Sequence, residues 1–278
     1  MHFSGVDVSA TSRLVSGAAG YRVGMPKPAG VERRWASRPS TVSVVAVFAA
    51  AGLAIAACSS STERAAPTNV VLVGDSLAEQ AAPYLAPLLG GKALVPQFFG
   101  GTAPCDWLGK DLQINKDSLL VISFTGNAVS PCMSDGAGGH LAGQAIVDKY
   151  RVDVTALVGE ARDARARVLL VGQPMHADAT STVIVDGINA IYDDLSKSTK
   201  DVRFVDAGAA VENRDGTFAH SLPCLPGEAE CDPSGNNVVR SDDGLHFCPG
   251  SPPPGPCSAY SSGAFRFANA IAGAVNAT

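Results

Sequence analysis

The chain has 278 residues and a formal net charge of −5 at pH 7. Residues 58–278, a suitable length for one α/β domain, contain fifteen lysines and arginines against 24 aspartates and glutamates, a net charge of −9. No cluster of basic residues interrupts this acidic composition. We therefore expect neither nucleic acid nor an anionic membrane surface as a partner of the folded part.

The N-terminal part of the sequence has the pattern of an export signal. An apolar run at 44–57 follows three arginines, Arg33, Arg34 and Arg38, and ends in small residues. A positive flank, a short apolar core and small residues before a cleavage site are typical of a secretory signal peptide. The run is shorter than the ~20 residues that a membrane-spanning helix needs, so an uncleaved anchor helix is the less favoured alternative.

The end of this signal resembles the lipobox of bacterial lipoproteins. Residues 55–58 read Ile-Ala-Ala-Cys, and in a lipobox the cysteine is lipidated and becomes the new N-terminus. We therefore expect a signal peptide at 1–57, with Met25 as an alternative start, and a lipid anchor on Cys58. Residues 58–68 lack a hydrophobic face and are expected to form a polar tether. The folded part would then be exported as a cell-surface or periplasmic lipoprotein, with partial secretion as an alternative.

The cysteine count also indicates export. Of seven cysteines, six remain if Cys58 carries a lipid, and an even number suits disulfides in an oxidising compartment. The expected pairs are Cys224–Cys231 and Cys248–Cys257, which close short loops, and the remaining Cys105–Cys132. A zinc site is the competing interpretation, but no Cys-x-x-Cys motif or Cys/His cluster supports it, so we expect no metal.

Short apolar runs alternate with helical patterns from residue 69 onward, which is typical of a parallel sheet covered by helices. Strands are expected at 69–73, 93–99, 118–124, 167–171 and 202–205. Helices are expected at 77–89, along the apolar face from Val147 to Ala161, along that from Ile184 to Leu195, and at 259–275. The stretch 206–256 is expected to be one long irregular loop that its cysteines staple.

A candidate nucleophile follows the first expected strand. Ligands of an open parallel sheet bind beyond the carboxyl ends of its strands, and Gly-Asp-Ser-Leu occupies 74–77 at such an end. A serine at a strand-to-helix turn exposes its hydroxyl and places its N–H at a helix N-terminus, where developing negative charge is favoured. The alternative is that Asp75 or Ser76 only caps the helix.

Three further segments follow expected strands or lie in the last loop. Gly100 and Gly101 come after the second strand, and Asn127 after the third. Glycine lets the backbone approach a ligand, and an asparagine amide is a good neutral donor. Asp243 precedes His246 by three residues; histidine can take a proton from serine, and a carboxylate can orient the imidazole. An ordinary surface turn is the alternative, because Asp-Gly is a common turn pair.

These four blocks, in this order, resemble the SGNH (GDSL) hydrolase superfamily, and the resemblance extends over roughly residues 69–275. It implies a three-layer α/β/α sandwich with a flavodoxin-like, parallel five-stranded sheet in a domain at 69–278. It also implies a catalytic triad of Ser76, Asp243 and His246. The oxyanion hole would consist of the Ser76 N–H, the Gly100 N–H and the Asn127 side chain.

Two features depart from the family pattern. The third block usually reads Gly-x-Asn-Asp, whereas 125–128 reads Thr-Gly-Asn-Ala. Gly101 competes with Gly100 for the second block, and we favour Gly100 because Gly-Gly-Thr then matches Gly-x-Thr. The larger α/β-hydrolase fold has the same order Ser, Asp, His, but its elbow reads Gly-x-Ser-x-Gly, and its nucleophile usually follows several strands. Ser76 fits neither condition.

The expected activity is that of a serine esterase that hydrolyses carboxylic esters through an acyl-enzyme, without a metal or an organic cofactor. Family analogy suggests acyl or O-acetyl groups on envelope glycans or lipids as substrates. The protein is expected to be a monomer that the lipidated N-terminus holds at the membrane. A non-catalytic envelope-binding lipoprotein on the same scaffold is the alternative, but its signature would be a broken triad.

Overall fold

The centre of the fold is a sheet of five parallel strands in the order β2-β1-β3-β4-β5. The structure, a computed structural model, describes residues 64–249 and 255–278. The strands are β1 (Asn69–Gly74), β2 (Ala93–Phe98), β3 (Ser118–Ser123), β4 (Arg167–Val171) and β5 (Val202–Val205). Each lies within one residue of its expected range, and the order is the flavodoxin-like one.

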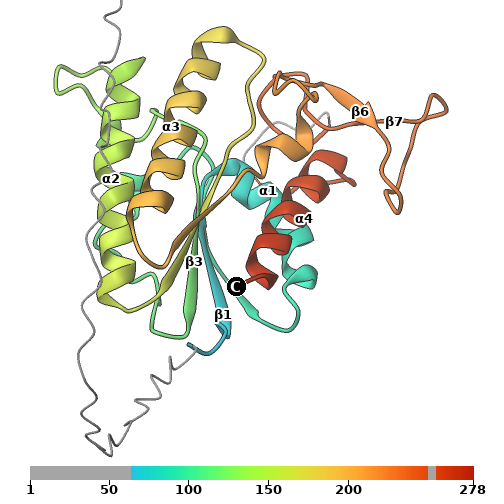
Figure 1. The fold of residues 1–278 in the computed structure, drawn as a ribbon. Coiled ribbons are helices and arrows are strands. Elements are labelled where there is room, and N and C mark those ends of the chain that lie inside the picture. The colour runs from blue at the N-terminus through green and yellow to red at the C-terminus, as the bar shows by residue number, and fades with distance from the viewer. Residues whose placement is uncertain (1–63, 250–254) are drawn as a thin grey trace, which may run out of the picture. The chain divides into compact units, whose positions relative to one another are not determined.

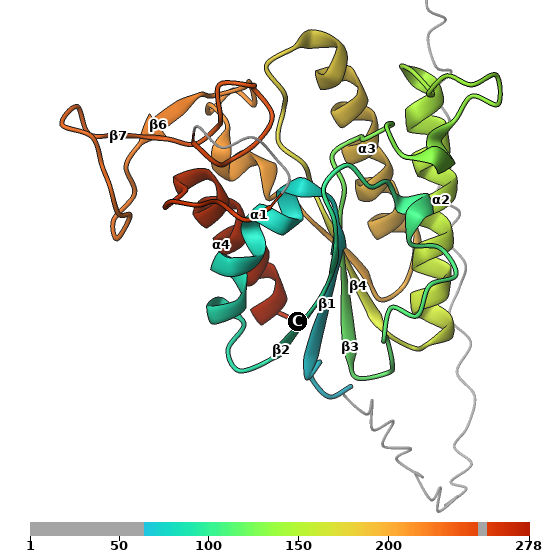
Figure 2. The ribbon, with the colours of Figure 1, turned by 180° about the vertical axis from the view of Figure 1, so that it is seen from behind.

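Two helices cover each face of this sheet (Figures 1 and 2). α1 (Ser76–Leu85) packs beside α4 (Ser262–Asn276) on one face, and α2 (Gln144–Asp163) packs beside α3 (Ala179–Ser198) on the other. Short 3-10 helices interrupt the connections: η1 (Ala86–Leu88), η2 (Pro104–Asp106), η3 (Pro131–Met133) and η4 (Gly208–Val211). The predicted three-layer sandwich is confirmed.

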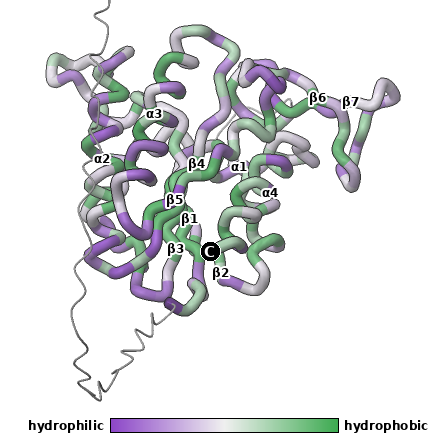
Figure 3. Tube along the Cα trace, in the orientation of Figure 1, coloured by the Kyte–Doolittle hydropathy of each residue, from purple (hydrophilic) through white to green (hydrophobic). Residues whose placement is uncertain are grey.

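The central strands are apolar without interruption because both of their faces are covered. Along β1, Val70 and Leu72 face the cluster under α1 and α4, whereas Val71 and Val73 face the cluster under α2 and α3. Successive side chains of a strand point to opposite faces, so one apolar strand supplies both cores. The hydropathy colouring of Figure 3 shows this apolar centre and the more polar outer surfaces of the helices.

The stretch between β5 and α4 differs from the prediction of one irregular loop. It contains η4 and an antiparallel hairpin, β6 (Ser221–Pro223) and β7 (Asn236–Val238). Strands of three residues are too short for an alternating pattern to be seen. α4 also begins three residues later than expected, because Ser261 is its N-cap and the Ser261 Oγ accepts the Ala264 N–H (3.2 Å).

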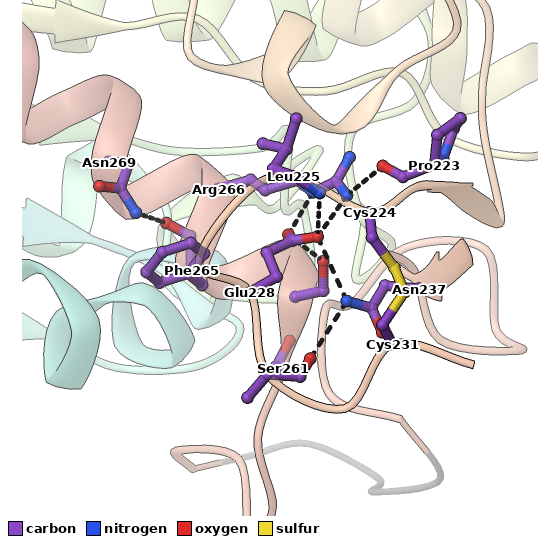
Figure 4. Close-up of polar contacts among 12 residues, drawn as sticks. Pro223, Cys224, Leu225, Glu228, Cys231, Asn237, Ser261, Phe265, Arg266 and Asn269 are labelled. Carbon is purple, nitrogen blue, oxygen red and sulfur yellow. Dashed lines mark hydrogen bonds and ion pairs between the residues drawn. A yellow bond between two sulfur atoms is a disulfide. The ribbon is translucent and has the colours of Figure 1, made fainter. Parts of the chain in front are cut away.

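A buried ion pair fixes this hairpin to α4 (Figure 4). Glu228 lies in the loop that the Cys224–Cys231 disulfide closes. Its carboxylate accepts hydrogen bonds from Arg266 Nε (2.6 Å) and Arg266 Nη2 (2.7 Å). The Glu228 side chain has no exposed surface, and that of Arg266 is 4% exposed. Burial alone would raise the pKa of Glu228, but its hydrogen bonds, first that from Arg266, lower it to about 2.

Glu228→Gln should lower the free energy of unfolding by about 3 kcal/mol at pH 7, because it leaves the Arg266 charge buried without a counter-charge. The folded-state pKa of Glu228 lies below its ordinary value, 4.5. The stabilisation is therefore complete above that value and is lost as the pH falls toward about 2. Denaturant unfolding of the wild type and the variant should show that their difference in free energy of unfolding is smaller at pH 3 than at pH 7. Glu230→Gln, in the same loop but exposed, is the control; an equal difference at both pH values would contradict the account.

The expected signal peptide at 1–57 and the lipid anchor Cys58 lie outside the described residues. No helix within 64–249 and 255–278 combines the length and the hydrophobicity that crossing a membrane requires.

Candidate active site

Ser76 and His246, 170 residues apart in the chain, meet beyond the carboxyl end of β1. His246 Nε2 lies 3.0 Å from Ser76 Oγ, and His246 Nδ1 lies 2.7 Å from Asp243 Oδ2. Both distances are those of hydrogen bonds. If Nδ1–H donates to Asp243, Nε2 is left as the acceptor for the Ser76 proton. The three side chains can therefore act as one proton relay.

The loop that carries Asp243 also fixes its carboxylate. Asp243 Oδ1 accepts the backbone N–H groups of Leu245 (2.8 Å) and His246 (2.9 Å). Partial burial would raise the pKa of Asp243, but the hydrogen bonds from His246 and Leu245 lower it below its ordinary value. The neighbouring Asp242 is exposed and pairs with His220 (3.1 Å). Asp243, and not Asp242, is thus the carboxylate that contacts the His246 imidazole.

The turn from β1 to α1 places Ser76 where the strand order reverses, between β1 and β3, which is the usual ligand site of such sheets. A Cβ on Gly74 would lie 2.4 Å from Ala78 Cβ and 2.5 Å from Ser123 O, so the close packing here requires glycine. Ser76 is the first residue of α1. Its N–H therefore lies at the positive end of the helix dipole.

Asp75, next to Ser76 in the chain, is fully buried. Its Oδ2 accepts the Thr125 N–H (2.6 Å) and Asn127 Nδ2 (2.9 Å), and its Oδ1 accepts the Leu77 N–H (3.2 Å). Burial raises the pKa of Asp75 to about 6, although these donors oppose the increase. Asp75 thus caps α1, as the alternative reading allowed, and also ties Asn127 to the serine turn.

The loop after β2 contains Gly100, which the sequence interpretation favours over Gly101 as an oxyanion-hole donor. The Gly100 N–H donates to the carboxylate of Glu79 on α1 (3.2 Å). The Thr102 N–H bonds to the carbonyl three residues earlier (3.2 Å), and Gly101 has a φ of +82°, so the loop is a type II turn. In the described part of the chain no acceptor binds the Gly101 N–H. The choice of Gly100 over Gly101 is therefore disfavoured, because Glu79 already engages the Gly100 N–H.

Gly100→Pro removes this N–H, and proline suits the second position of a type II turn. We expect kcat for an aryl acetate to fall less than about tenfold, because loss of a true oxyanion donor costs on the order of 10²- to 10³-fold. Asn127→Ala is the matched comparison and should show the larger loss. Steady-state kinetics at saturating ester measures both. A loss on the order of 10²-fold in folded Gly100→Pro would reinstate Gly100 as a donor.

Arg240, which the sequence interpretation overlooked, supports the backbone next to His246. Its side chain is fully buried, and its Nη2 donates to Leu245 O (2.6 Å). The guanidinium carbon lies 5.6 Å from the ring centre of Phe218 and 5.5 Å from that of Phe247, so the cation is held by two aromatic rings. Burial lowers the pKa of Arg240 to about 10, and the group stays protonated at neutral pH.

Two side chains fix the backbone of Phe247, the residue after His246. The Phe247 N–H donates to Gln80 Oε1 of α1 (2.8 Å), four residues after Ser76. The Ser261 Oγ donates to Phe247 O (2.8 Å), next to the first residue of α4. Cys248 follows directly and is bonded to Cys257. These contacts connect the histidine loop to both helices of one sheet face.

Arg240→Met should lower kcat on the order of 100-fold with little change in KM, because a displacement of about 1 Å in the histidine loop can cost that much. Arg240→Lys should not rescue activity, since a lysine lacks the planar guanidinium that lies over the two rings. Arg203→Met is the control, because Arg203 is exposed and donates to carbonyls at the end of α4. An Arg240→Met protein that is folded and fully active would refute this positioning role.

The three disulfides are those expected from the sequence, with Cα–Cα distances of 6.1 Å for Cys105–Cys132, 6.1 Å for Cys224–Cys231 and 5.0 Å for Cys248–Cys257. The Cys105–Cys132 bridge joins the loop after β2 to the loop after β3. Cys105, Asp106 and Cys132 are close enough together to surround an ion. The bridge uses both sulfur atoms, however, so these cysteines are not available as thiolate ligands.

Comparison with known proteins gives a family and a fold. The sequence profile of the family described as "Protein of unknown function (DUF459)" matches residues 106–251. No curated protein matches the chain.

Two solved structures are similar over most of their length. One is a catalytic mutant of an acetylxylan esterase from Geobacillus stearothermophilus, with a TM-score of 0.51 and 13% identity over 76% of this chain and 96% of that one. The other is a protein provisionally assigned as an acylhydrolase from Bacteroides fragilis, with a TM-score of 0.50 and 17% identity over 78% of this chain and 92% of that one. At these identities the likeness shows the fold, which is that of the SGNH (GDSL) hydrolases.

Proposed function

Because the chain belongs to the DUF459 family, whose function is unknown, we propose from its own residues that it is a serine esterase that works through an acyl-enzyme. The observation that carries the proposal is the hydrogen-bonded series from Ser76 Oγ through His246 to Asp243, at 3.0 and 2.7 Å. A serine, a histidine and a carboxylate in these contacts are the groups that acyl transfer needs. A non-catalytic scaffold would have no need of all three.

In the proposed reaction Ser76 Oγ attacks the ester carbonyl while His246 Nε2 takes the hydroxyl proton. The tetrahedral intermediate collapses to an acyl-serine, and His246 returns the proton to the departing alcohol. A water molecule then attacks the acyl-serine, with His246 again as base, and releases the acid. Asp243 holds the imidazole in the required tautomer and stabilises its charged form.

The negative oxygen of the intermediate would form next to the N-terminus of α1. The Ser76 N–H is one proposed donor, because the helix dipole favours an anion there. Asn127 is a second: Nδ2 has two hydrogens, and only one is needed for its bond to Asp75. Gly101, whose N–H has no acceptor within the described residues, is the third.

The proposed substrates are carboxylic esters, in particular acyl or O-acetyl groups on glycans or lipids of the cell envelope. The export signal and the lipobox-like residues at 55–58 support this location. A lipid on Cys58 would keep a monomeric enzyme at the membrane, with its acidic domain outside the cytoplasm. The fold shared with an acetylxylan esterase is consistent with O-acetyl groups as substrates.

Ser76→Ala should abolish hydrolysis of p-nitrophenyl acetate while leaving the thermal midpoint of unfolding unchanged. Asp243→Asn should lower kcat on the order of 10⁴-fold, because the imidazole would lose its orienting carboxylate. Asp242→Asn is the matched control and should keep activity, since Asp242 contacts His220 and not His246. Full turnover by folded Ser76→Ala, or equal losses in the two aspartate variants, would refute the assignment.

A further inference from the structure

A cavity lies apart from the serine turn, between α4, η4 and the hairpin loop after β6. It has a volume of about 820 Å³, within the range of small-molecule sites. Leu222, Leu225, Pro226 and Phe265 supply much of its apolar lining. None of the triad residues lines it, so the proposed esterase reaction does not account for it.

The wall of this cavity is held in place before any ligand arrives. Glu228 Oε2 accepts the Leu225 N–H (2.8 Å) and Asn237 Nδ2 (3.2 Å), and Glu228 Oε1 accepts the Ser262 hydroxyl (2.6 Å). These bonds add to the ion pair with Arg266 that Figure 4 shows. A preformed wall lowers the cost of ordering side chains when a ligand binds.

Besides the opposite charges of Arg214 and Glu212, three polar side chains in the lining have atoms without a protein partner in the described part of the chain. Arg266 uses Nε and Nη2 for Glu228 and Pro223 O, which leaves Nη1. Asn269 uses Nδ2 for the Phe265 carbonyl, which leaves Oδ1. Asn213 uses Nδ2 for Thr217 and Phe218, which also leaves Oδ1. In addition to these two charges, the cavity thus offers one donor group and two acceptors beside an apolar wall that includes an aromatic ring.

We propose that this cavity binds a neutral oligosaccharide. Each hydroxyl of a sugar can both donate and accept, as the mixture of Nη1 and two Oδ1 atoms requires, and the C–H face of the ring fits an apolar wall. An acyl chain would leave these polar atoms without partners at a cost of free energy. An anion gains little, because Glu228 neutralises Arg266, and the Glu212 carboxylate offsets the charge of Arg214 in the same lining.

The cavity is connected to the histidine loop by a short series of contacts. Glu212, in its lining, accepts the Met175 N–H (2.7 Å). Two residues along that segment, the Ala177 N–H donates to Gly244 O (3.0 Å), next to Asp243. If the proposed esterase site acts on a glycan, the glycan held in this cavity would be its acylated substrate. That last identification rests on the proposed function; binding in the cavity does not.

The test is calorimetric titration of the full chain carrying Ser76→Ala with neutral hexasaccharides of xylose, glucose, mannose and N-acetylglucosamine, and separately with dodecanoate. At least one hexasaccharide should bind with a Kd of about 1 mM or lower, and dodecanoate should not bind. Asn269→Leu should weaken sugar binding at least about tenfold, equivalent to 1.4 kcal/mol. Asn276→Leu, the same change on α4 outside the cavity lining, should leave it unchanged.

Failure of all four sugars to bind, binding of dodecanoate instead, or sugar binding that Asn269→Leu does not weaken would overturn this inference. Because the titration uses a protein without the nucleophile, it does not depend on esterase activity. Sugar binding by a wild-type protein that hydrolyses no ester would support the cavity and refute the proposed function. Ester hydrolysis without sugar binding would support the proposed function and refute the sugar-binding cavity.

Discussion

The hydrogen bond between Ser76 Oγ and His246 Nε2 joins two side chains that are 170 residues apart, and much of the fold serves to keep them at 3.0 Å. Bringing together two residues so far apart in the chain costs conformational entropy, which contacts at both ends must offset. The serine end is rigid because it follows a buried strand. The histidine end lies in a long connection without a strand of the main sheet, so its position depends on side chains.

Those side chains come from several elements. Gln80 of α1 binds the backbone after the histidine, and Arg240 binds the backbone before it. The Cys248–Cys257 bridge begins two residues after His246, and the α4 N-cap Ser261 donates to the Phe247 carbonyl. The proposed chemistry therefore uses three residues, but their geometry depends on buried polar contacts that take no part in proton transfer.

The two buried arginines of the C-terminal region illustrate two ways to place a charge inside this domain. Arg266 has a carboxylate partner, Glu228, and the pair fixes the hairpin to α4. No carboxylate forms a hydrogen bond with the Arg240 side chain within residues 64–249 and 255–278; its guanidinium lies over two aromatic rings and gives one bond to a carbonyl. The Glu228–Arg266 pair stabilises the wall of the cavity, and Arg240 positions the histidine loop. Both are consistent with an acidic protein whose few buried cations have specific structural roles.

The sheet could be predicted from the sequence because β1 and β3 are unbroken apolar runs and the helices have clear apolar faces. Ser76 could be located because it follows the carboxyl end of a central strand, whereas Asp243 and His246 could be located because their spacing in the last loop resembles the SGNH pattern. The hairpin β6–β7 was missed, since strands of three residues show no period. The roles of Arg240, Gln80 and Glu79 were missed for a different reason: each depends on a contact with a distant loop, and no local pattern distinguishes a buried polar side chain from an exposed one.

The most direct test of the account is whether Ser76 is a nucleophile. The wild-type protein should be treated with a fluorophosphonate, digested and examined by mass spectrometry, with His246→Ala treated in parallel. We expect one phosphonyl group per chain, on Ser76, in the wild type and far slower labelling in the variant. An unlabelled Ser76 in folded wild-type protein, or equally fast labelling without His246, would contradict it.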